Sequence, residues 1–462
     1  MDFALLNLSK RFITSIIITL SIVLVKSVER YEFENDFKMN IPSCTNEDAN
    51  VTLRLRNAVI STIGDNFISS PTLTCVDLSK NQILNISKGS FKDVPNLKYL
   101  NVSHNRLLST SILHVINSHS QLQALIVDSQ YLHKCELLRN LDKPYVFPQL
   151  KYLSMNYNGI KNLYNELDSK CDDYKGCCIY INMICPELSH LDISNNNFHD
   201  IEFINRFSFK NLKYLDVSGN FIQNINLTYK EHLVHLNADH NSIKSISFNN
   251  HKLDGSIYLN GMTKLKYLSL SYNEILRIDM FALEDLTELV ILMLNNNRLT
   301  SIPSNNFAFL KSLKTLNLNS NKFKSVPNLY NYLNITELFM DRNMISKLTN
   351  NSFAKMPFLE TLSLKNNKIN FVEEGAFTGL YYLKVLDLSY NTINQLPLDW
   401  SSGFNNLYYL NLNRNDFTNF EALSLSKLTP VLNLDLRENL IKNITKRTCD
   451  IFPEYMTIML LD

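Results

Sequence analysis

The sequence predicts an α/β solenoid, a single curved array in which short parallel strands stack side by side. The first observation is an eleven-residue pattern, L-x-x-L-x-L-x-x-N-x-L, which is present at Leu289–Leu299 and again in the same form at Leu313–Phe323. The second is its recurrence, with the asparagine position at residues 58, 81, 105, 130, 158, 196, 220, 241, 273, 297, 321, 343, 367, 391, 415 and 439. The third is its regularity, since all but Ala58 and Gln130 are Asn at these sixteen positions and the steps from 343 to 439 are all equal. Sixteen copies at a nearly fixed period are the signature of a repeat architecture.

The strands follow from the L-x-L core of the pattern, whose eleven positions we number so that the asparagine is position 9. Successive side chains of a strand point to opposite faces, so positions 4 and 6 face the core and positions 3 and 5 face the other surface. Stacked copies then form a parallel sheet on the concave side. The return segments on the convex side are too short and irregular for full helices. No repeat buries its own apolar face alone, so stability is a sum of unit and neighbour terms.

The asparagine and a phenylalanine have mechanical roles in this arrangement. An inward-turned amide both donates and accepts, so the position 9 side chain satisfies backbone groups in neighbouring loops that no strand pairing reaches. Ten residues later the most regular copies carry an aromatic residue, which we expect to fill the core beneath the convex loops, at Phe91, Phe307, Phe353 and Phe377.

Composition excludes several classes of protein. The 462 residues carry 45 basic and 44 acidic side chains, and 45% are hydrophobic. Near-zero net charge without a basic run argues against a nucleic-acid partner, and the apolar content excludes a disordered chain. Neither a G-x-G-x-x-G nor a phosphate-loop motif occurs, and neither does a G-x-S-x-G or H-E-x-x-H motif. We therefore predict no cofactor and no enzyme.

The amino terminus predicts export from the cell. Lys10 and Arg11 precede an apolar stretch over 12–25, which is too short to span a bilayer comfortably, and Lys26 ends it. We interpret residues 1–27 as a secretory signal peptide, with an uncleaved signal anchor as the alternative. Seven Asn-x-Ser/Thr sequons are consistent with a secreted glycoprotein, at Asn50, Asn85, Asn101, Asn226, Asn334, Asn350 and Asn443.

In its repeat motif and period, the chain resembles the 24-residue class of the extracellular leucine-rich repeat superfamily. The motif that carries the resemblance is Leu383–Ile393 with Phe377 before it, and the similarity to Toll-like receptor and chaoptin-like ectodomains extends over about residues 50–462. It implies a leucine-rich repeat horseshoe with a concave parallel sheet, about 16 repeats and a partial last one. Members of this superfamily usually carry several cysteines before the first strand, whereas the short cap segment at 28–50 has only Cys44, for which Cys75 is the expected disulfide partner.

Departures from the period mark insertions. The step from 158 to 196 is the longest in the array, and we predict a cysteine-containing insertion at 161–187. Five cysteines in this part of the chain predict a disulfide-stapled protrusion, although an odd number leaves one without a partner in the cluster; they are Cys135, Cys171, Cys177, Cys178 and Cys185. A zinc site is the alternative. The step from 241 to 273 is also long and has no cysteine.

The carboxy terminus falls within a strand. Leu460 follows Leu436 by one regular repeat period, so the array over 51–462 is expected to have no carboxy-terminal cap. Either the chain is a truncated form of a longer protein or something else covers its last core layer. No membrane span is expected after the signal peptide.

The outward positions define a candidate ligand surface. Position 3 carries alternating tyrosine and histidine in the middle repeats, and two aspartates lie beside this stripe, giving as candidate ligand-binding residues Tyr152, His190, Asp192, Tyr214, Asp216, His235 and Tyr267. Strands about 4.8 Å apart bring these rings into one surface, which suits a protein-binding face. Two alternatives stay open: these residues are ordinary consensus residues of the repeat with no ligand, or the histidines and aspartates form a metal site. We predict no metal site.

These observations favour a secreted or cell-surface recognition module, of an innate-immune-like receptor or adhesion type, which binds an unknown protein or glycoprotein on its concave face. The location would be extracellular or the outer face of the plasma membrane. Two alternatives stay open. The first is a structural or adhesive protein that self-associates, with a dimer as its simplest form, and the second is a truncated form of a transmembrane receptor.

Overall fold

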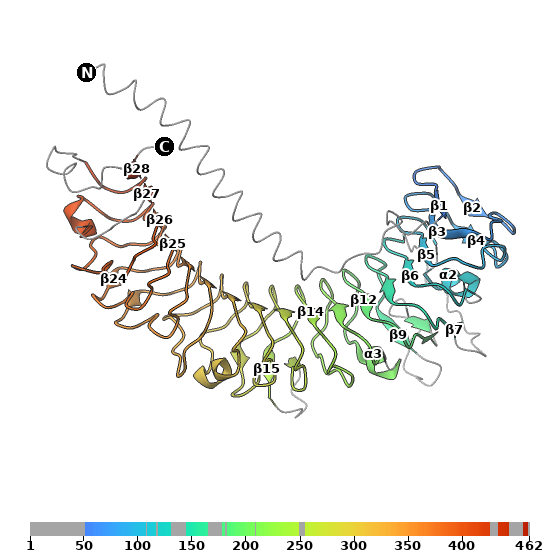
Figure 1. The fold of residues 1–462 in the computed structure, drawn as a ribbon, viewed down its shortest axis with the longest axis horizontal. Helices are drawn as coiled ribbons and strands as arrows, with labels where there is room; N and C mark the ends of the chain where they lie inside the picture. Colours follow the sequence, from blue (N-terminus) through green and yellow to red (C-terminus); the bar gives the residue numbers. More distant parts are fainter. Residues whose placement is uncertain are drawn as a thin grey trace, which may run out of the picture.

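The computed structural model shows an arc of stacked repeats, with the strands on the inner side and the return segments on the outer side (Figure 1). The structure describes residues 51–107, 109–116, 119–130, 145–164, 178–180, 183–207, 209–248, 255–425, 433–442 and 456–460. The amino-terminal repeats lie at one end of the arc and the carboxy-terminal repeats at the other (Figure 1).

One 17-stranded parallel sheet lines the concave side, and its strands lie in chain order. Each strand pairs with the equivalent strand of the next repeat, so that position 3 lies beside position 3 throughout, as His190 does beside Tyr214. The strands are β1 (Val51–Arg54), β3 (Leu73–Asp77), β5 (Tyr99–Asn101), β6 (Ala124–Ile126), β8 (Tyr152–Ser154), β12 (His190–Asp192), β13 (Tyr214–Asp216), β14 (His235–Asn237), β17 (Tyr267–Ser269), β19 (Ile291–Met293), β20 (Thr315–Asn317), β21 (Glu337–Phe339), β23 (Thr361–Ser363), β25 (Val385–Asp387), β26 (Tyr409–Asn411), β27 (Asn433–Asp435) and β28 (Thr457–Met459). Sixteen full repeats and a last partial one were expected, and the predicted solenoid is confirmed.

The convex side is built of short pieces. Among the described residues it holds two α-helices, α2 (Ser109–Ile116) and α3 (Glu202–Arg206), and two 3₁₀ turns, Ser304–Ala308 and Glu421–Leu423. Small parallel sheets join neighbouring return segments, formed by β2 (Thr62–Ile63) with β4 (Asn85–Ile86), β7 (Tyr145–Val146) with β11 (Met183–Ile184), β9 (Asn162–Tyr164) with β10 (Cys178–Tyr180), β15 (Ser245–Ser247) with β16 (Ser256–Tyr258) and β18 (Arg277–Ile278), and β22 (Lys347–Leu348) with β24 (Phe371–Val372). The expected scarcity of helix on this side is therefore observed.

An asparagine ladder connects the repeats. Asn321 is representative: its Oδ1 accepts the backbone N–H of Leu299 at 2.9 Å, and its Nδ2 donates to the carbonyl of Leu294 at 2.8 Å and to that of Leu318 at 3.2 Å. Gln130 makes the same kind of bond, with Oε1 accepting from Leu107 N at 3.0 Å. Each side chain thereby satisfies buried backbone groups of the preceding repeat, as the sequence predicted.

The core is one continuous apolar cluster between the sheet and the return segments. Phe91, Phe307, Phe353 and Phe377 are all buried, with at most 4% of the side chain exposed, which confirms their predicted role. The rings of Phe353 and Phe377 stack with centroids 5.9 Å apart. Phe353 and Phe377 belong to adjacent repeats, so their rings stack directly, whereas Phe91 and Phe307 occupy the same core position in other repeats.

A free thiol in this core corrects one cysteine prediction. Cys185 is 3% exposed and forms no disulfide. It lies eleven residues before the asparagine of its repeat, and the equivalent residues Phe147 and Phe209 are also buried. Cys185 therefore occupies a regular core position, and its assignment to the disulfide cluster is wrong. Burial raises the pKa of its thiol to about 12.

The backbone turns sharply after every strand. The residue before the asparagine, position 8, has φ between 52° and 65° in all sixteen repeats, and only one of these sixteen, Gly219, is glycine. A left-handed conformation at a residue with a β-carbon costs free energy, so the surrounding ladder must hold it in place. The turn projects the position 8 side chains outward at the edge of the sheet.

Candidate functional site

A column of stacked rings crosses the middle of the concave sheet. The position 3 residues of β8, β12, β13, β14 and β17 lie in register, one per strand. His190 stacks on Tyr214 with centroids 4.3 Å apart, and His235 stacks on Tyr267 at the same distance. Tilted contacts at 6.0 Å and 5.9 Å join these pairs to Tyr152 and to each other. The structure thus brings the five predicted rings into one surface.

The rings differ in how much they present to solvent. Tyr152 and His235 are 3% and 8% exposed, whereas His190, Tyr214 and Tyr267 are half-buried. Burial, and then the nearby Lys213, lowers the pKa of His190 to about 4. This histidine is therefore neutral at physiological pH, and its contact area with a ligand is that of an uncharged aromatic ring.

The aspartates beside the rings are occupied by contacts within the protein. Asp192 Oδ1 accepts the backbone N–H of Ser194 at 2.9 Å, and its Oδ2 accepts from Asn156 Nδ2 at 3.0 Å. Asp216 accepts the Ser218 N–H at 2.9 Å, and burial followed by repulsion from Asp192 raises its pKa to about 6. Both carboxyl groups hold the turn that follows their strand, so they position the rings.

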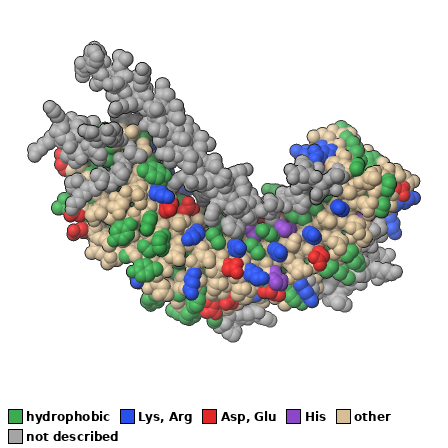
Figure 2. Space-filling model, viewed as in Figure 1, with side chains coloured by type: hydrophobic (Ala, Val, Ile, Leu, Met, Phe, Trp, Pro, Cys, Tyr) green, Lys and Arg blue, Asp and Glu red, His purple; other side chains and the backbone are tan. Residues whose placement is uncertain are grey.

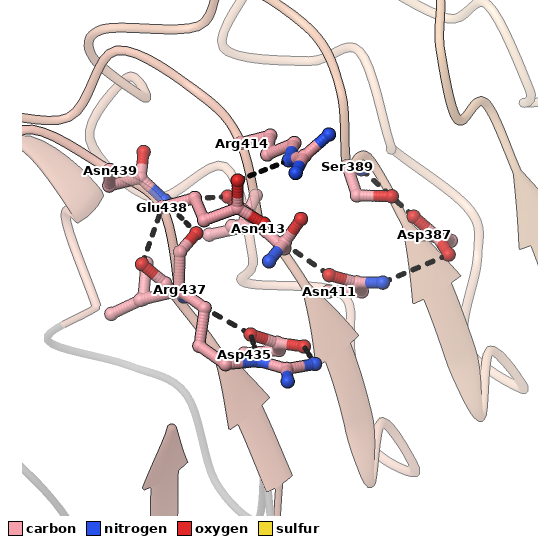
Figure 3. A network of polar contacts seen from close by, with 11 residues as sticks. Asp387, Ser389, Asn411, Asn413, Arg414, Asp435, Arg437, Glu438 and Asn439 are labelled. Carbon is pink, nitrogen blue, oxygen red and sulfur yellow. Dashed lines mark hydrogen bonds and ion pairs between the residues drawn. The ribbon is translucent and has the colours of Figure 1, made fainter. Parts of the chain in front are cut away.

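This turn is stabilised in the same way at the carboxy-terminal end of the sheet (Figure 3). Asp387 accepts the Ser389 N–H at 2.8 Å and the Asn411 side chain at 3.1 Å, and Asp435 accepts both the backbone N–H and the guanidinium of Arg437. Nine described repeats use Asp or Asn at position 5 to accept the position 7 N–H.

Three repeats use a crossed version of this contact. Where position 5 is serine, the aspartate comes from position 7 of the preceding repeat and accepts both the serine hydroxyl and the next position 7 N–H. The three pairs are Asp128 with Ser154, Asp239 with Ser269 and Asp341 with Ser363. Position 7 is aspartate in no other repeat. An aspartate at position 7 followed by a serine at position 5 of the next repeat is therefore the sequence signal for this contact, and the general repeat pattern does not contain it.

A second row of side chains follows the edge of the sheet at position 8. Tyr157 and Tyr272 are 62% and 49% exposed, and the ring of His240 stacks on that of Tyr272 at 4.1 Å. The left-handed backbone turns these residues away from the strands. These residues form an accessible edge beside the ring column, which the pattern at position 3 alone does not reveal.

The sequons lie on different surfaces. Asn85, Asn226, Asn334 and Asn350 are exposed. Asn101 is 8% exposed within β5, where its Oδ1 accepts the Ser103 N–H at 2.9 Å and hydroxyl at 2.7 Å. The Asn101 side chain is therefore nearly buried in the concave face, and glycosylation at this sequon stays a prediction. Asn50 and Asn443 lie outside the described residues.

The remaining cysteine predictions are only partly described. Cys75 is disulfide-bonded, but Cys44, Cys135, Cys171 and Cys177 lie outside the described residues, as do the signal peptide and the cap at 28–50. β9 and β10 pair across part of the predicted 161–187 insertion. The described ranges contain no group of three His, Cys, Asp or Glu side chains that could hold a metal ion.

The parallel sheet, the asparagine ladder and the short return segments define a leucine-rich repeat solenoid. Family models for leucine rich repeats match residues 52–132, 287–345 and 357–417, and a two-copy model matches 186–229. Together they cover more than half of the chain. The protein belongs to the leucine-rich repeat family.

Similar proteins agree with this fold. The chain is 27% identical to chicken (Gallus gallus) Tsukushi over 164 residues, which are 35% of this chain and 39% of Tsukushi. Drosophila Toll in its complex with Spatzle matches with a TM-score of 0.55 and 18% identity, over 79% of this chain and 48% of Toll. A Leptospira interrogans leucine-rich repeat protein matches with a TM-score of 0.52 and 21% identity, over 88% and 94% of the two chains. The chain thus spans less than half of Tsukushi and of Toll, and these structural likenesses establish the fold. In the described segments no helix is long and apolar enough to cross a bilayer.

Proposed function

We propose that this protein is a secreted or cell-surface recognition module that binds a protein ligand through the ring column of its concave face. The observation that carries the proposal is the alternating Tyr–His column on five adjacent strands, which is half-exposed at His190, Tyr214 and Tyr267. A horseshoe presents such a surface to a convex partner along its whole inner curve.

The chemistry of the column favours a protein ligand. Tyrosine contributes a large contact area with few rotatable bonds, and stacking on a neighbouring histidine fixes the ring before a ligand arrives. The carboxyl groups of Asp192 and Asp216 already accept hydrogen bonds from the chain, so they support the rings and their turns. A preorganised aromatic surface of this kind loses little conformational entropy on binding.

Export belongs to the same proposal. A signal peptide over 1–27, a short cap at 28–50 with a Cys44–Cys75 bridge, and glycans on the exposed sequons would give an extracellular protein. The neighbours are consistent with this location, since Toll with Spatzle is described as a hub of development and innate immunity. Expression of the full chain in insect cells tests it. Recovery from the medium with Val28 as the new amino terminus, and a mass shift with a glycosidase, are expected; a protein retained in the cell would contradict the proposal.

The concave face is tested by replacing Tyr214, His235 and Tyr267 together with alanine. The matched control replaces Tyr330 and Tyr382, which are 71% and 51% exposed and lie away from the column. Both proteins are compared with the wild type in a binding screen against a library of secreted and membrane ectodomains, after circular dichroism shows that they are folded. Loss of a binding partner in the triple variant alone is expected. Unchanged binding by a folded triple variant would refute the proposal.

Self-association is the second function, and one observation favours it. Exposed aromatic side chains gather in the carboxy-terminal half, where the Phe358 and Tyr382 rings lie 5.9 Å apart and Tyr332 is 68% exposed. Apolar side chains cluster on the visible face of this half, between interspersed basic and acidic groups (Figure 2). Light scattering decides this case, since a monodisperse monomer at high concentration argues against self-association. A receptor form is tested by sequencing the transcript beyond codon 462.

A further inference from the structure

A polar pocket lies at the edge of the concave sheet, beyond the ring column. It has a volume of about 360 Å³ and is lined by Tyr272, Asn295, Asn296, Asn319, Ser320, Asp341, Arg342 and Lys365. Each of these side chains comes from position 7 or position 8 of its repeat, and together they belong to five consecutive repeats. The volume falls within the roughly 300–1,000 Å³ typical of small-ligand sites, and nothing in the proposed protein-binding function uses it.

Internal hydrogen bonds leave the pocket rich in donors. Asn319 Oδ1 accepts the Asp341 N–H at 2.6 Å, and Asn295 Oδ1 accepts the Ser271 hydroxyl at 2.8 Å. Both amide Nδ2 groups therefore keep their hydrogens for a ligand. The carboxyl oxygen of Asp341 already accepts from the Ser363 hydroxyl and from the Lys365 N–H. The one acidic side chain of the pocket is thus occupied on its inner side.

Neither cation of the pocket forms an ion pair among the described residues, although Lys365 is close enough to Asp341 to act electrostatically on its carboxyl group. Arg342 forms no ion pair within the described ranges, and Lys365 lies with its Nζ 5.0 Å from the ring centroid of Tyr390. By contrast, the arginine of the repeat at 297, Arg298, pairs with Glu274 at 3.4 Å outside the pocket. The pocket therefore combines two positive charges that form no ion pair in the described ranges, one partly buried carboxyl group and several neutral N–H and O–H donors. The excess of positive charge and donors is the complement of an oxyanion-bearing ligand.

An aromatic platform closes one end. The Tyr272 ring is 49% exposed, and His240 stacks on its other side at 4.1 Å with an interplanar angle of 11°. The left-handed φ of 54° at Tyr272 turns this ring out from the sheet. A held, half-exposed ring offers its face and edge to the C–H groups of a sugar ring, while the neighbouring amides bond to hydroxyl groups.

From this geometry we propose that the pocket is a binding site for an acidic oligosaccharide, which would lie across the repeats from Tyr272 to Arg342 and Lys365. Tyr272 contacts one sugar ring, Asn295 and Asn319 donate to hydroxyl or ring oxygens, and the two cations hold a carboxylate or sulfate group. Four strand spacings of about 4.8 Å separate the first and last repeats of the pocket, which gives a track about 19 Å long. Donors distributed over that length suit a chain with repeated oxygens better than a single small anion.

The test measures binding of defined sugars to the full-length protein by isothermal calorimetry at 150 mM salt. The probes are a heparin octasaccharide, which carries sulfate and carboxylate, an octagalacturonate, which carries carboxylate alone, and neutral maltooctaose. We expect the acidic probes to bind at least ten-fold more tightly than maltooctaose, and the better of the two identifies the anion that the pocket prefers. An octamer of uridylate serves as a polyanion without sugar carboxylates or sulfates.

The variants separate the pocket from general positive charge. Arg342→Gln with Lys365→Gln removes both pocket cations, whereas Lys322→Gln with Lys368→Gln removes two exposed lysines of neighbouring repeats that do not line the pocket. The pocket variant should weaken the acidic octasaccharide at least ten-fold and the control variant less than two-fold. Tyr272→Ala should weaken it three- to ten-fold with little change in the salt dependence of binding, because this substitution removes no charge.

Several results would overturn the proposal. Equal losses in the two double variants would mean that the sugar is attracted by the overall surface charge. Binding of the uridylate octamer as tight as that of the best sugar would identify a nonspecific polyanion surface. Absence of measurable binding of any acidic probe at millimolar concentration by the folded wild type would also reject the site. None of these outcomes depends on whether the ring column binds a protein.

Discussion

The crossed contact between Asp239 and Ser269 predicts that these two residues can exchange places but cannot be changed one at a time. Asp239 accepts the Ser271 N–H at 2.6 Å and the Ser269 hydroxyl, and Ser269 and Ser271 are 1% and 3% exposed. Asp239→Ser leaves both donors without a carboxylate. Each orphaned buried donor costs about 1–3 kcal/mol, and relief of the desolvated carboxylate offsets part of this, so a loss of about 2 kcal/mol is expected.

The other single variant, Ser269→Asp, should lose stability for a different reason. Ser269→Asp places a second carboxylate next to Asp239 and removes the hydroxyl donor, so the two negative charges repel each other in a partly buried site, and a loss of about 2 kcal/mol is expected here too. In the double variant, the carboxylate introduced by Ser269→Asp would accept the Ser271 N–H from position 5, as Asp216 accepts that of Ser218 at 2.9 Å. The double variant should therefore be within about 1 kcal/mol of the wild type, an interaction energy of about 3 kcal/mol.

Local hydrogen exchange is the appropriate assay, because a long repeat array need not unfold in one step. Protection of the amides in β14 and β17 reports the opening of these two strands, and urea titration followed by circular dichroism reports the whole array. The control combines the same substitutions at unconnected, exposed sites, Asp416→Ser with Ser301→Asp, whose effects should be additive within about 0.5 kcal/mol. If the double variant in β14 and β17 is as unstable as the sum of its single variants, the reasoning is refuted.

The same structure makes three other predictions. Asn297→Ala should cost about 2–4 kcal/mol by urea titration, because it orphans the Ile275 N–H at 3.0 Å and the Leu270 carbonyl at 2.8 Å, whereas exposed Asn370→Ala should change stability by less than about 0.5 kcal/mol. Phe353→Ala should cost about 3–5 kcal/mol and Phe358→Ala, which is 47% exposed, less than about 1 kcal/mol, and equal costs would contradict the predicted core. Burial raises the pKa of Asp128 from 3.8 to about 6, so its contribution to stability is fully present below pH 3.8 and is lost as pH rises through 6. Asp128→Asn should therefore exceed the wild type by up to about 3 kcal/mol at pH 7.5 and lose this advantage by pH 4, and a pH-independent difference would count against the buried carboxyl.

The repeat register was predictable because its physical requirements are local. A leucine at positions 4 and 6 must face inward, and an asparagine at position 9 must reach the preceding loop, so the pattern located β20 and the bonds of Asn321 without further information. Gln130 shows the tolerance of this rule, since its longer side chain still accepts the Leu107 N–H at 3.0 Å. The same register placed the five rings of the concave column next to one another.

Features that depend on packing between repeats were less predictable. Cys185 was grouped with the cysteines near it in the sequence, yet its place eleven residues before an asparagine makes it a core residue like Phe209. Asp192 and Asp216 were predicted as ligand-binding residues from their place beside the rings, but the hydrogen bonds that they accept in the turn after each strand were not predicted. The pocket at Arg342 depends on the left-handed turn at position 8. Because the residue type at position 8 varies from repeat to repeat, the sequence shows no pattern there that would predict a pocket.

The crossed carboxylate contacts also limit how the array can be lengthened or shortened. Most repeats satisfy their own turn, as β25 does through Asp387, so removal of one such unit would rejoin equivalent partners on either side. A junction between Asp239 and Ser269 would instead separate a donor from the acceptor that only its neighbour supplies. The three crossed pairs thus join their repeats into units that recombination must gain or lose together, and they divide an otherwise uniform solenoid into unequal segments.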